Sequence, residues 1–154
     1  MKPTKIKTYQ AKEFTDRKNS LSQFLKSSVF KNIKDDILRT YVAKEFMYTV
    51  LHHAIEMCDD VFTELVFVEY SNGVITLEPK RSKKVIAHTT FGDEVNTDLR
   101  TVYLTATSIA YNKFCWLKGI SNDDGIELSR IYYNSNDIGY SKYSDSNAYF
   151  KLID

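Results

Sequence analysis

Residues 61–70 read VFTELVFVEY, residues 71–73 read SNG, and residues 74–77 read VITL. The first segment is rich in β-branched and aromatic residues, with Leu65 and Phe67 on one face, which favours a strand. The pair Asn72-Gly73 supplies the positive φ angles that a tight hairpin turn demands. Residues 74–77 are then the returning strand, so this stretch predicts an antiparallel hairpin.

The hairpin continues into a third predicted strand. Pro79 ends the second strand, because proline cannot donate to a sheet ladder. The basic residues 80–84 form a turn, and Val85-Ile86-Ala87-His88 follows as a strand. The sequence therefore predicts a small antiparallel β-meander over about residues 62–88.

A long helix is predicted before the meander. Asp35 and Asp36 place negative charge at a helix start, where the helix dipole favours it. Apolar residues then recur mostly at steps of three and four up to about Cys58. They are Ile37, Leu38, Tyr41, Val42, Phe46, Val50, Leu51, Ala54 and Ile55.

Further helices are predicted on both sides. The capping box Ser20-Leu21-Ser22-Gln23 indicates a short helix near the N-terminus. After the meander we expect a helix from about 95 to 117 capped by Asn96 or Thr97, with Gly119 beyond its end. A helix over about 125–133 capped by Asp123 and a last one over 148–153 capped by Ser144 follow. The expected fold is α+β, with the meander packed against several helices.

The 154 residues fit one domain, in which residues 35–154 form the α+β body and residues 1–34 a basic N-terminal arm. The arm has nine basic and two acidic residues, net +7, and the other 120 residues have 12 basic and 18 acidic residues, net −6. Such an arm is typical of contact with nucleic acid or an acidic partner, and equally of a solvated terminus.

The two cysteines, Cys58 and Cys115, both lie in apolar stretches. Two buried thiols in a reducing compartment are expected, with a disulfide as the alternative. No apolar region of a signal peptide follows the N-terminal residues, and no run approaches the ~18 apolar residues of a membrane span. We therefore expect a cytoplasmic protein without a membrane partner.

No pattern in the sequence predicts catalysis, a cofactor or a metal site. His88-Thr89-Thr90 matches one half of a two-histidine phosphoesterase motif, but no second copy supplies the other histidine. His52 and Glu56 are one helical turn apart without a third ligand, so a solvent-facing pair is expected. The pairs Asp59-Asp60 and Asp123-Asp124 fit a turn and a helix start. We expect a protein that is not an enzyme.

Tyrosines gather in the last third of the chain together with asparagine and serine. This composition is typical of recognition surfaces, and also of an ordinary half-buried shell. The residues concerned are Tyr132, Tyr133, Tyr140 and Tyr143, with Asn134, Ser135 and Asn136.

Three stretches resemble the ArdB/KlcA family of antirestriction proteins of plasmids and other mobile elements. Residues 64–79, ELVFVEYSNGVITLEP, resemble that family's hairpin, L-S-N-G-G-F-Y-M-x-P. Residues 91–98, FGDEVNTD, resemble its F-S-G-E-M-S-A-D, and residues 143–154, YSDSNAYFKLID, resemble its closing H-P-E-A…I…I-D. Val74 replaces the family's second glycine, and residues 1–34 have no counterpart.

The resemblance implies an α+β domain that relieves type I restriction without mimicking the charge of DNA. The net charge of +1 agrees with that, because a DNA mimic needs a dense negative field. We thus expect a non-enzymatic anti-defence protein of a mobile element or phage, in the cytoplasm of a bacterial host. It would bind a protein complex of the restriction type or of a related system such as CRISPR.

Three surfaces are candidates for that contact: the acidic residues Asp93, Glu94 and Asp98, the hairpin tip Asn72-Gly73, and the tyrosine-rich segment with Tyr132, Tyr133, Tyr140 and Tyr143. The alternative function is a small nucleic-acid-binding accessory protein that uses the basic arm together with the basic residues of 80–84. We expect weak nucleic-acid binding at most, and we expect deletion of residues 1–12 to leave anti-defence activity largely intact.

Overall fold

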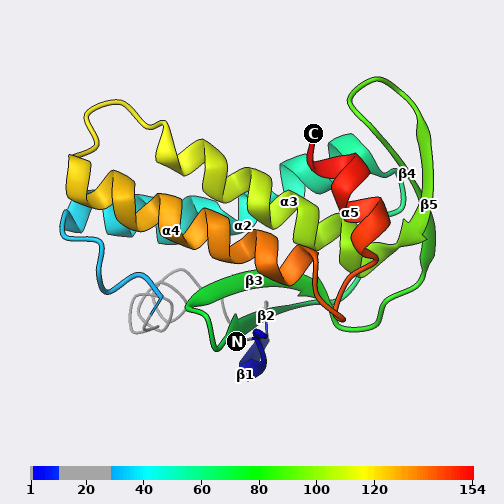
Figure 1. The fold of residues 1–154 in the computed structure, drawn as a ribbon, viewed down its shortest axis with the longest axis horizontal. Helices are drawn as coiled ribbons and strands as arrows, with labels where there is room; N and C mark the ends of the chain where they lie inside the picture. The colour runs from blue at the N-terminus through cyan, green and yellow to red at the C-terminus, as the bar shows by residue number, and fades with distance from the viewer. Residues whose placement is uncertain (1, 11–28) are drawn as a thin grey trace.

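The computed structural model describes residues 2–10 and 29–154. Within them the helices α2, α3 and α4 lie side by side, and a three-stranded sheet runs along one side of them (Figure 1). The fold class is α+β, as predicted. The elements are β1 (Lys5–Gln10), α2 (Asp36–Met57), β2 (Leu65–Tyr70), β3 (Val74–Pro79), β4 (Lys84–His88), β5 (Glu94–Asp98), α3 (Leu99–Cys115), α4 (Asn122–Gly139) and α5 (Ser146–Ile153).

Helix α2 follows its prediction closely. The side chain of Asp35 caps it by accepting hydrogen bonds from the backbone N–H groups of Ile37 and Leu38 at 2.9 and 3.0 Å. One face is buried and includes Phe46, whose ring lies 5.2 Å from that of Tyr111 on α3. The short helix predicted near residue 20 lies outside the described residues. None of the described helices has the length and apolar character that a membrane span requires.

The hairpin predicted around Asn72-Gly73 is present as β2 and β3, paired antiparallel from Leu65↔Pro79 to Tyr70↔Val74. Gly73 has a φ of 77°, the positive value that the turn demands. All twelve residues of the two strands are buried. The third strand of the sheet is β1, which pairs antiparallel with β2. Part of the basic arm therefore belongs to the sheet, which the sequence reading did not predict.

A bulge in β1 between Lys5 and Lys7 turns these two lysines to opposite faces of the sheet. The Nζ atom of Lys7 lies 4.6 Å from the centre of the Tyr9 ring, whose hydroxyl donates a hydrogen bond to Glu69. Lys5 instead reaches Glu78 on β3, with 3.8 Å between Nζ and Oε1. Without the bulge, both lysines would share one face, since side chains alternate along a strand.

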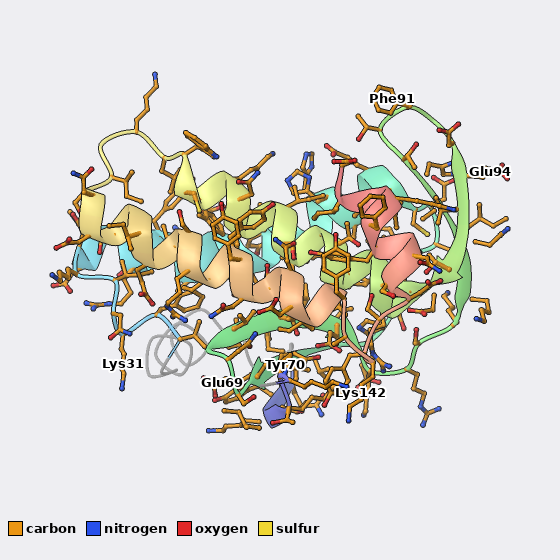
Figure 2. All side chains as sticks on the ribbon, in the orientation of Figure 1. Lys31, Glu69, Tyr70, Phe91, Glu94 and Lys142 are labelled. Carbon is orange, nitrogen blue, oxygen red and sulfur yellow. The ribbon has the colours of Figure 1, made fainter. Side chains whose placement is uncertain are left out.

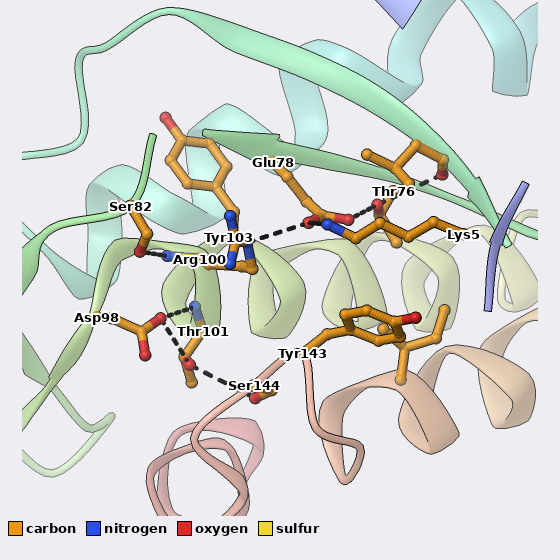
Figure 3. Close-up of polar contacts among 12 residues, drawn as sticks. Lys5, Thr76, Glu78, Ser82, Asp98, Arg100, Thr101, Tyr103, Tyr143 and Ser144 are labelled. Atoms are coloured by element: carbon orange, nitrogen blue, oxygen red, sulfur yellow. Dashed lines mark hydrogen bonds and ion pairs between the residues drawn. The ribbon is translucent and has the colours of Figure 1, made fainter. Parts of the chain in front are cut away.

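Glu78 is a buried carboxylate that joins β1, β3 and α3 (Figure 3). Its Oε2 accepts hydrogen bonds from the hydroxyls of Tyr70, at 2.6 Å, and Thr76. Its Oε1 lies 3.4 Å from Nε of Arg100 at the start of α3. A buried charge is costly unless it is paired and hydrogen-bonded, so these contacts hold β3 in place relative to β1 and α3. Burial, followed by the charge of Glu78, raises the pKa of Tyr70 above its usual value.

The predicted third strand of the meander exists but pairs differently. Residues 84–88 form β4, which pairs with β5 and not with β3. The reason is that residues 94–98, read as the start of a helix, continue the alternation of β4 across a turn at Gly92. Val85 and Ala87 on β4 are buried, as are Val95 and Thr97 on β5. The predicted three-stranded meander over 62–88 is therefore divided: β2 and β3 form one hairpin, and β4 belongs to a second hairpin that continues to Asp98.

Helix α3 lies at the centre of the molecule. Every residue from Thr101 to Ser108 is buried, which is more than two helical turns and therefore covers all sides of the helix. Its N-cap is Asp98, which accepts hydrogen bonds from Thr101 N–H and Oγ1 at 2.8 and 3.0 Å, so the predicted caps Asn96 and Thr97 are wrong. Its other end at Cys115 agrees with the prediction to within two residues.

Helix α4 is longer than predicted and is capped by Ser121, not by Asp123. The polar residues after Tyr133 favour a loop, yet they continue the helix because α3 and α5 supply partners for them. Ser135 Oγ lies 2.8 Å from Ser108 Oγ, and Asn136 accepts a hydrogen bond from Tyr149. Helix α5 begins at Ser146 with Asp145 as its cap, which replaces the predicted cap Ser144.

The packing of α5 on α4 predicts opposite effects for two glycines of one helix. A Cβ atom on Gly139 would lie 2.2 Å from the Tyr149 ring, whereas one on Gly125 meets nothing within 4 Å. We expect Gly139→Ala to lower the free energy of unfolding by about 1–3 kcal/mol or more through overpacking. Gly125→Ala should raise it by about 0.5–1 kcal/mol through helix propensity. Urea unfolding of both variants checks this, and a Gly139→Ala protein as stable as wild type would contradict the packing of Tyr149.

Buried His53 predicts a loss of stability in mild acid. Its Nε2 has no hydrogen-bond partner among the described residues, and the charged groups facing it are Glu56 and His52 of α2 and Lys113 of α3. Burial, followed by the charge of Lys113, lowers the pKa of His53 below 6.5. The unfolded chain then binds a proton that the folded chain does not, so stability falls as the pH drops through about 6.5.

His53→Leu places an apolar side chain in this buried position and removes the titrating group. Between pH 7.5 and 5.5 its free energy of unfolding should fall less than that of wild type. His52→Gln is the control, because His52 is exposed and its removal should leave the wild-type pH dependence. Denaturant titrations at both pH values measure the difference, and parallel losses in wild type and His53→Leu would show that another group is responsible.

Candidate docking site on the second hairpin

The β4–β5 hairpin has one face on the helical body and one face outward. Val85, Ala87, Val95 and Thr97 are the buried side chains, and the residues between them are exposed or half-buried. Thr97 Oγ1 donates a hydrogen bond of 3.4 Å to Asp145, the residue that caps α5. Helix α5 thus supports the hairpin. The far end of the hairpin extends beyond the helices (Figure 1).

The tip of this hairpin is a defined turn. The N–H of Gly92 donates to the carbonyl of Thr89 at 2.9 Å, and the N–H of Thr89 donates to the carbonyl of Asp93 at 2.9 Å. The Thr89 hydroxyl accepts from Asp93 N–H at 3.1 Å. Gly92 has a φ of 86°, as a three-residue loop with a left-handed last position requires. Thr90 Oγ1 also donates to the carbonyl of Asp154 at 3.2 Å, which ties the turn to the C-terminal residue.

This turn presents an aromatic side chain close in sequence to two acidic residues. Phe91 is 89% exposed, and Asp93 and Glu94 are exposed beside it. Figure 2 shows Phe91 and Glu94 at the edge of the molecule, away from the helices. Neither carboxylate forms an ion pair with a described residue. We call residues 89–94 the acidic tip. Its hydrogen bonds fix the backbone, so little conformational entropy remains to be lost on binding.

A hollow of about 770 Å³ lies next to the acidic tip, between the outward face of the hairpin and the turn after α2. Its walls include Lys84, His88, Glu94 and Asn96 from the hairpin and Asp60 from the turn. The groove is mostly polar in its side chains. Of these residues, Asp60 forms an ion pair of 2.8 Å with Lys83, which precedes β4.

Asn72 and Gly73, expected at a partner surface, are bound to α4 instead. The Asn72 side-chain amide donates to the carbonyl of Asn134, and the Asn134 amide donates to the carbonyl of Asn72, both at 2.9 Å. A Cβ atom on Gly73 would lie 3.2 Å from Arg130. These contacts give the turn a structural role in joining the sheet to α4.

Asp98 lies apart from Asp93 and Glu94. It is the last residue of β5 and is half-buried, and its carboxylate caps α3. Of the three acidic residues expected to act together, the structure brings Asp93 and Glu94 together at the tip and leaves Asp98 at the base.

The four tyrosines do not form one surface. Tyr143 is half-buried, with its ring 5.4 Å from Tyr70, and Tyr132 is half-buried against the core. Tyr133 and Tyr140 are exposed on α4 and at its end, and the Tyr140 ring packs edge-on against Tyr149 at 5.0 Å. Of the two interpretations of this tyrosine-rich segment, the half-buried shell describes most of it.

The structure also describes the residues that the sequence offered as possible metal ligands or nucleophiles. His52 and Glu56 form the expected exposed pair, 2.8 Å apart. Within residues 2–10 and 29–154 no three His, Cys, Asp or Glu side chains are placed to hold a metal ion. Cys58 and Cys115 are free thiols, and burial raises the pKa of both, which disfavours the reactive thiolate.

Three lysines of the basic arm are held by intramolecular contacts. Lys5 pairs with Glu78, Lys7 lies over Tyr9, and Lys34 pairs with Asp123 at 2.9 Å. These contacts leave fewer cations for phosphates than the composition of the arm indicates.

No protein-family model matches the chain, and no curated protein matches it in sequence. The fold and the geometry of the acidic tip are therefore what bears on function beyond the family resemblance.

Phe91 belongs to the candidate site but was not predicted from the sequence as a contact residue. It was included in a family-like stretch but not among the candidate contacts. The available signal was Phe91-Gly92 between two alternating segments, because a glycine after a turn residue indicates a hairpin loop and an aromatic residue inside such a loop points to solvent.

Proposed function

We propose that this chain is a non-enzymatic anti-defence protein of a mobile element or phage. It inhibits host restriction, or a related defence system such as CRISPR, by binding a protein complex, and the acidic tip makes the main contact. The observation that supports this proposal is Phe91, an almost fully exposed aromatic side chain on a hydrogen-bonded turn. Aromatic residues are enriched in the centres of protein interfaces.

The energetics of the tip suit this role. Full burial of an exposed phenylalanine contributes about 1.5–3 kcal/mol. Asp93 and Glu94 add a negative rim, which favours a basic surface on the partner and speeds encounter with it. A rigid turn with one apolar anchor and charged neighbours has the arrangement of a small binding hot spot.

The position of the family-like stretches also supports the proposal. Residues 91–98 form part of the tip and the whole of β5, and residues 143–154 include α5 and its cap, which contact the hairpin through Asp145 and Asp154. Two stretches that resemble one antirestriction family and lie far apart in sequence thus build one part of the molecule.

The tip predicts a loss of function that is separate from stability. Phe91→Ser should lower the plating efficiency of unmodified phage on an expressing host with a type I restriction system by about tenfold or more, or weaken protection equally in a CRISPR host. Its free energy of unfolding should stay within about 0.5 kcal/mol of wild type, as for other exposed sites. Phe62→Ser is the matched control, because Phe62 is 77% exposed in the connection between α2 and β2.

The charge variant Asp93→Asn with Glu94→Gln should lower activity less than Phe91→Ser does. Its effect should shrink as salt rises, because rim charges act mainly on encounter. Full activity of Phe91→Ser, or equal losses in Phe91→Ser and Phe62→Ser, would contradict docking through the tip. Failure of the wild-type chain against a broad panel of defence systems would contradict the anti-defence role itself.

A second test concerns the absence of catalysis. His88 ends β4, is half-buried and lies across the strand pair from Glu94. If the protein acts by binding, His88→Ala should leave its activity within a few-fold of wild type. A general acid–base group contributes about 10²–10⁴-fold, so a loss of that size with unchanged thermal stability would assign His88 to an enzymatic site.

A further inference from the structure

The turn between β2 and β3 contains Asn72-Gly73, the only place in the sequence where a glycine follows an asparagine. The backbone nitrogen of the residue after an asparagine can attack the carbonyl carbon of the asparagine side chain, which is the first step of deamidation. Glycine has no Cβ atom, so its nitrogen is the least hindered for this attack. Asn72 is therefore the asparagine of this chain whose local sequence most favours deamidation.

The closed turn opposes the reaction at three groups. The Gly73 N–H, which must lose its proton to attack, donates a hydrogen bond of 3.1 Å to the carbonyl of Tyr70. The side-chain nitrogen of Asn72, which must leave, donates to the carbonyl of Asn134 at 2.9 Å. The Asn134 amide in return donates to the carbonyl of Asn72 at 2.9 Å. Because Asn72 is only half-buried, these contacts protect it rather than depth in the protein.

The protection of Asn72 is local to one contact with α4. Ser71, the first residue of the turn, is held by the sheet: its N–H donates to the carbonyl of Thr4 at 2.8 Å, and its hydroxyl accepts from Thr4 N–H at 2.9 Å. Asn72 is held by Asn134 of α4 instead. Breaking this second contact releases the reacting side chain while the strands stay paired, and such local opening costs less than global unfolding.

One atom of the closed turn favours its opening. The Oδ1 atom of Asn72 is buried and has no hydrogen-bond partner among the described residues. A buried acceptor without a partner costs free energy, which is recovered when the acceptor reaches water. The contact between Asn72 and Asn134 is therefore weaker than its two hydrogen bonds alone would make it.

We propose that Asn72 is a site of spontaneous deamidation controlled by α4: release of the turn from Asn134 starts an irreversible conversion to aspartate and isoaspartate. A bond forms between the Gly73 nitrogen and Cγ of Asn72, and the bond between Cγ and Nδ2 breaks. Nδ2 departs as ammonia with the proton from Gly73. Water then opens the cyclic imide at either of its carbonyls, so the net change is the gain of water and the loss of ammonia, without oxidation or reduction.

Neither product can restore the original turn. A carboxylate at position 72 has no donor for the carbonyl of Asn134, so two acceptors would face each other. Isoaspartate adds a methylene group to the main chain between positions 72 and 73, and the antiparallel pairing of Tyr70 with Val74 across the turn then no longer fits. Deamidation therefore loosens the sheet from α4 and marks the molecules whose turn has opened.

Mass spectrometry of digested protein measures the conversion, because replacement of the amide nitrogen by oxygen raises the mass of the fragment that contains residue 72. The folded chain and a synthetic peptide of residues 68–77 are incubated in the same mildly alkaline buffer. The peptide lacks α4 and gives the unprotected rate. Asn72 in the folded chain should convert at least about tenfold more slowly than in the peptide.

Variants separate the contact with α4 from overall stability. Asn134→Ala removes the amide that holds the carbonyl of Asn72 and should speed conversion at least about fivefold. Asn134→Asp keeps the shape without the donor and should act in the same direction. Tyr133→Ala, at an exposed position of α4, is the matched control and should stay within about twofold of wild type. Val42→Ala leaves a cavity at a buried position of α2, so it lowers global stability with the turn contact intact and should convert more slowly than Asn134→Ala.

Two further measurements follow the turn itself. Hydrogen exchange of the Gly73 N–H should be faster in Asn134→Ala than in wild type or Val42→Ala. The direct product, made as Asn72→Asp, should unfold at a lower urea concentration than wild type.

Conversion in the folded wild type as fast as in the peptide would overturn the inference, because the fold would then give no protection. Equal rates in wild type and both Asn134 variants would overturn it too. If Val42→Ala converts as fast as the Asn134 variants, global unfolding is the route and the control by α4 is refuted. The proposed anti-defence role does not enter this test, so neither result decides the other.

Discussion

The burial of α3 on all sides is the constraint on which the rest of the fold depends. Between Thr101 and Ser108 the helix has no solvent face, so every hydroxyl there must find a partner within the protein. Thr105 and Thr107 bond to carbonyls of their own helix, whereas Tyr103 donates to the carbonyl of Val61 at 2.6 Å and Tyr111 to that of Ile75. Each outward bond attaches another element, so satisfying α3 also fixes the sheet in place.

The same demand explains the features that look irregular. Ser108 on α3 lies within hydrogen-bond distance of Ser135 on α4 and accepts from Tyr149 on α5, so three helices share one buried polar contact. Glu78 needs cations inside the core, and the bulge in β1 turns Lys5 toward it. Helix α5, held in this way, in turn supports the hairpin that ends in Phe91. The exposed tip is thus positioned by contacts that begin in the core.

The sequence predicted what local pattern controls and missed what tertiary contacts control. Helix α2 and the β2–β3 hairpin followed from periodicity and from Asn72-Gly73. The polar run at the end of α4 favours a loop on propensity alone, and only Ser108 and Tyr149, distant in sequence, make it helical. Likewise the residues of β1 were predicted to be part of a charged arm, because nothing in the local sequence indicates that Lys5 contacts Glu78 and the ring of Tyr143. Among the candidate contact residues, Asn72 was predicted to face a partner protein but is hydrogen-bonded to α4 instead. Its partner Asn134 lies 62 residues later in the chain, so no local pattern indicates the contact.

Helix α3 also places the acidic tip. It begins directly after β5, whose hairpin ends in that tip, and every residue from Thr101 to Ser108 is buried. Its 17 residues span about 25 Å, and its last turns expose Asn112 and Lys113 to solvent. The helix is therefore packed on all sides near the end from which the hairpin extends. A tip attached to a base that is fixed in this way loses little conformational entropy when it binds a partner.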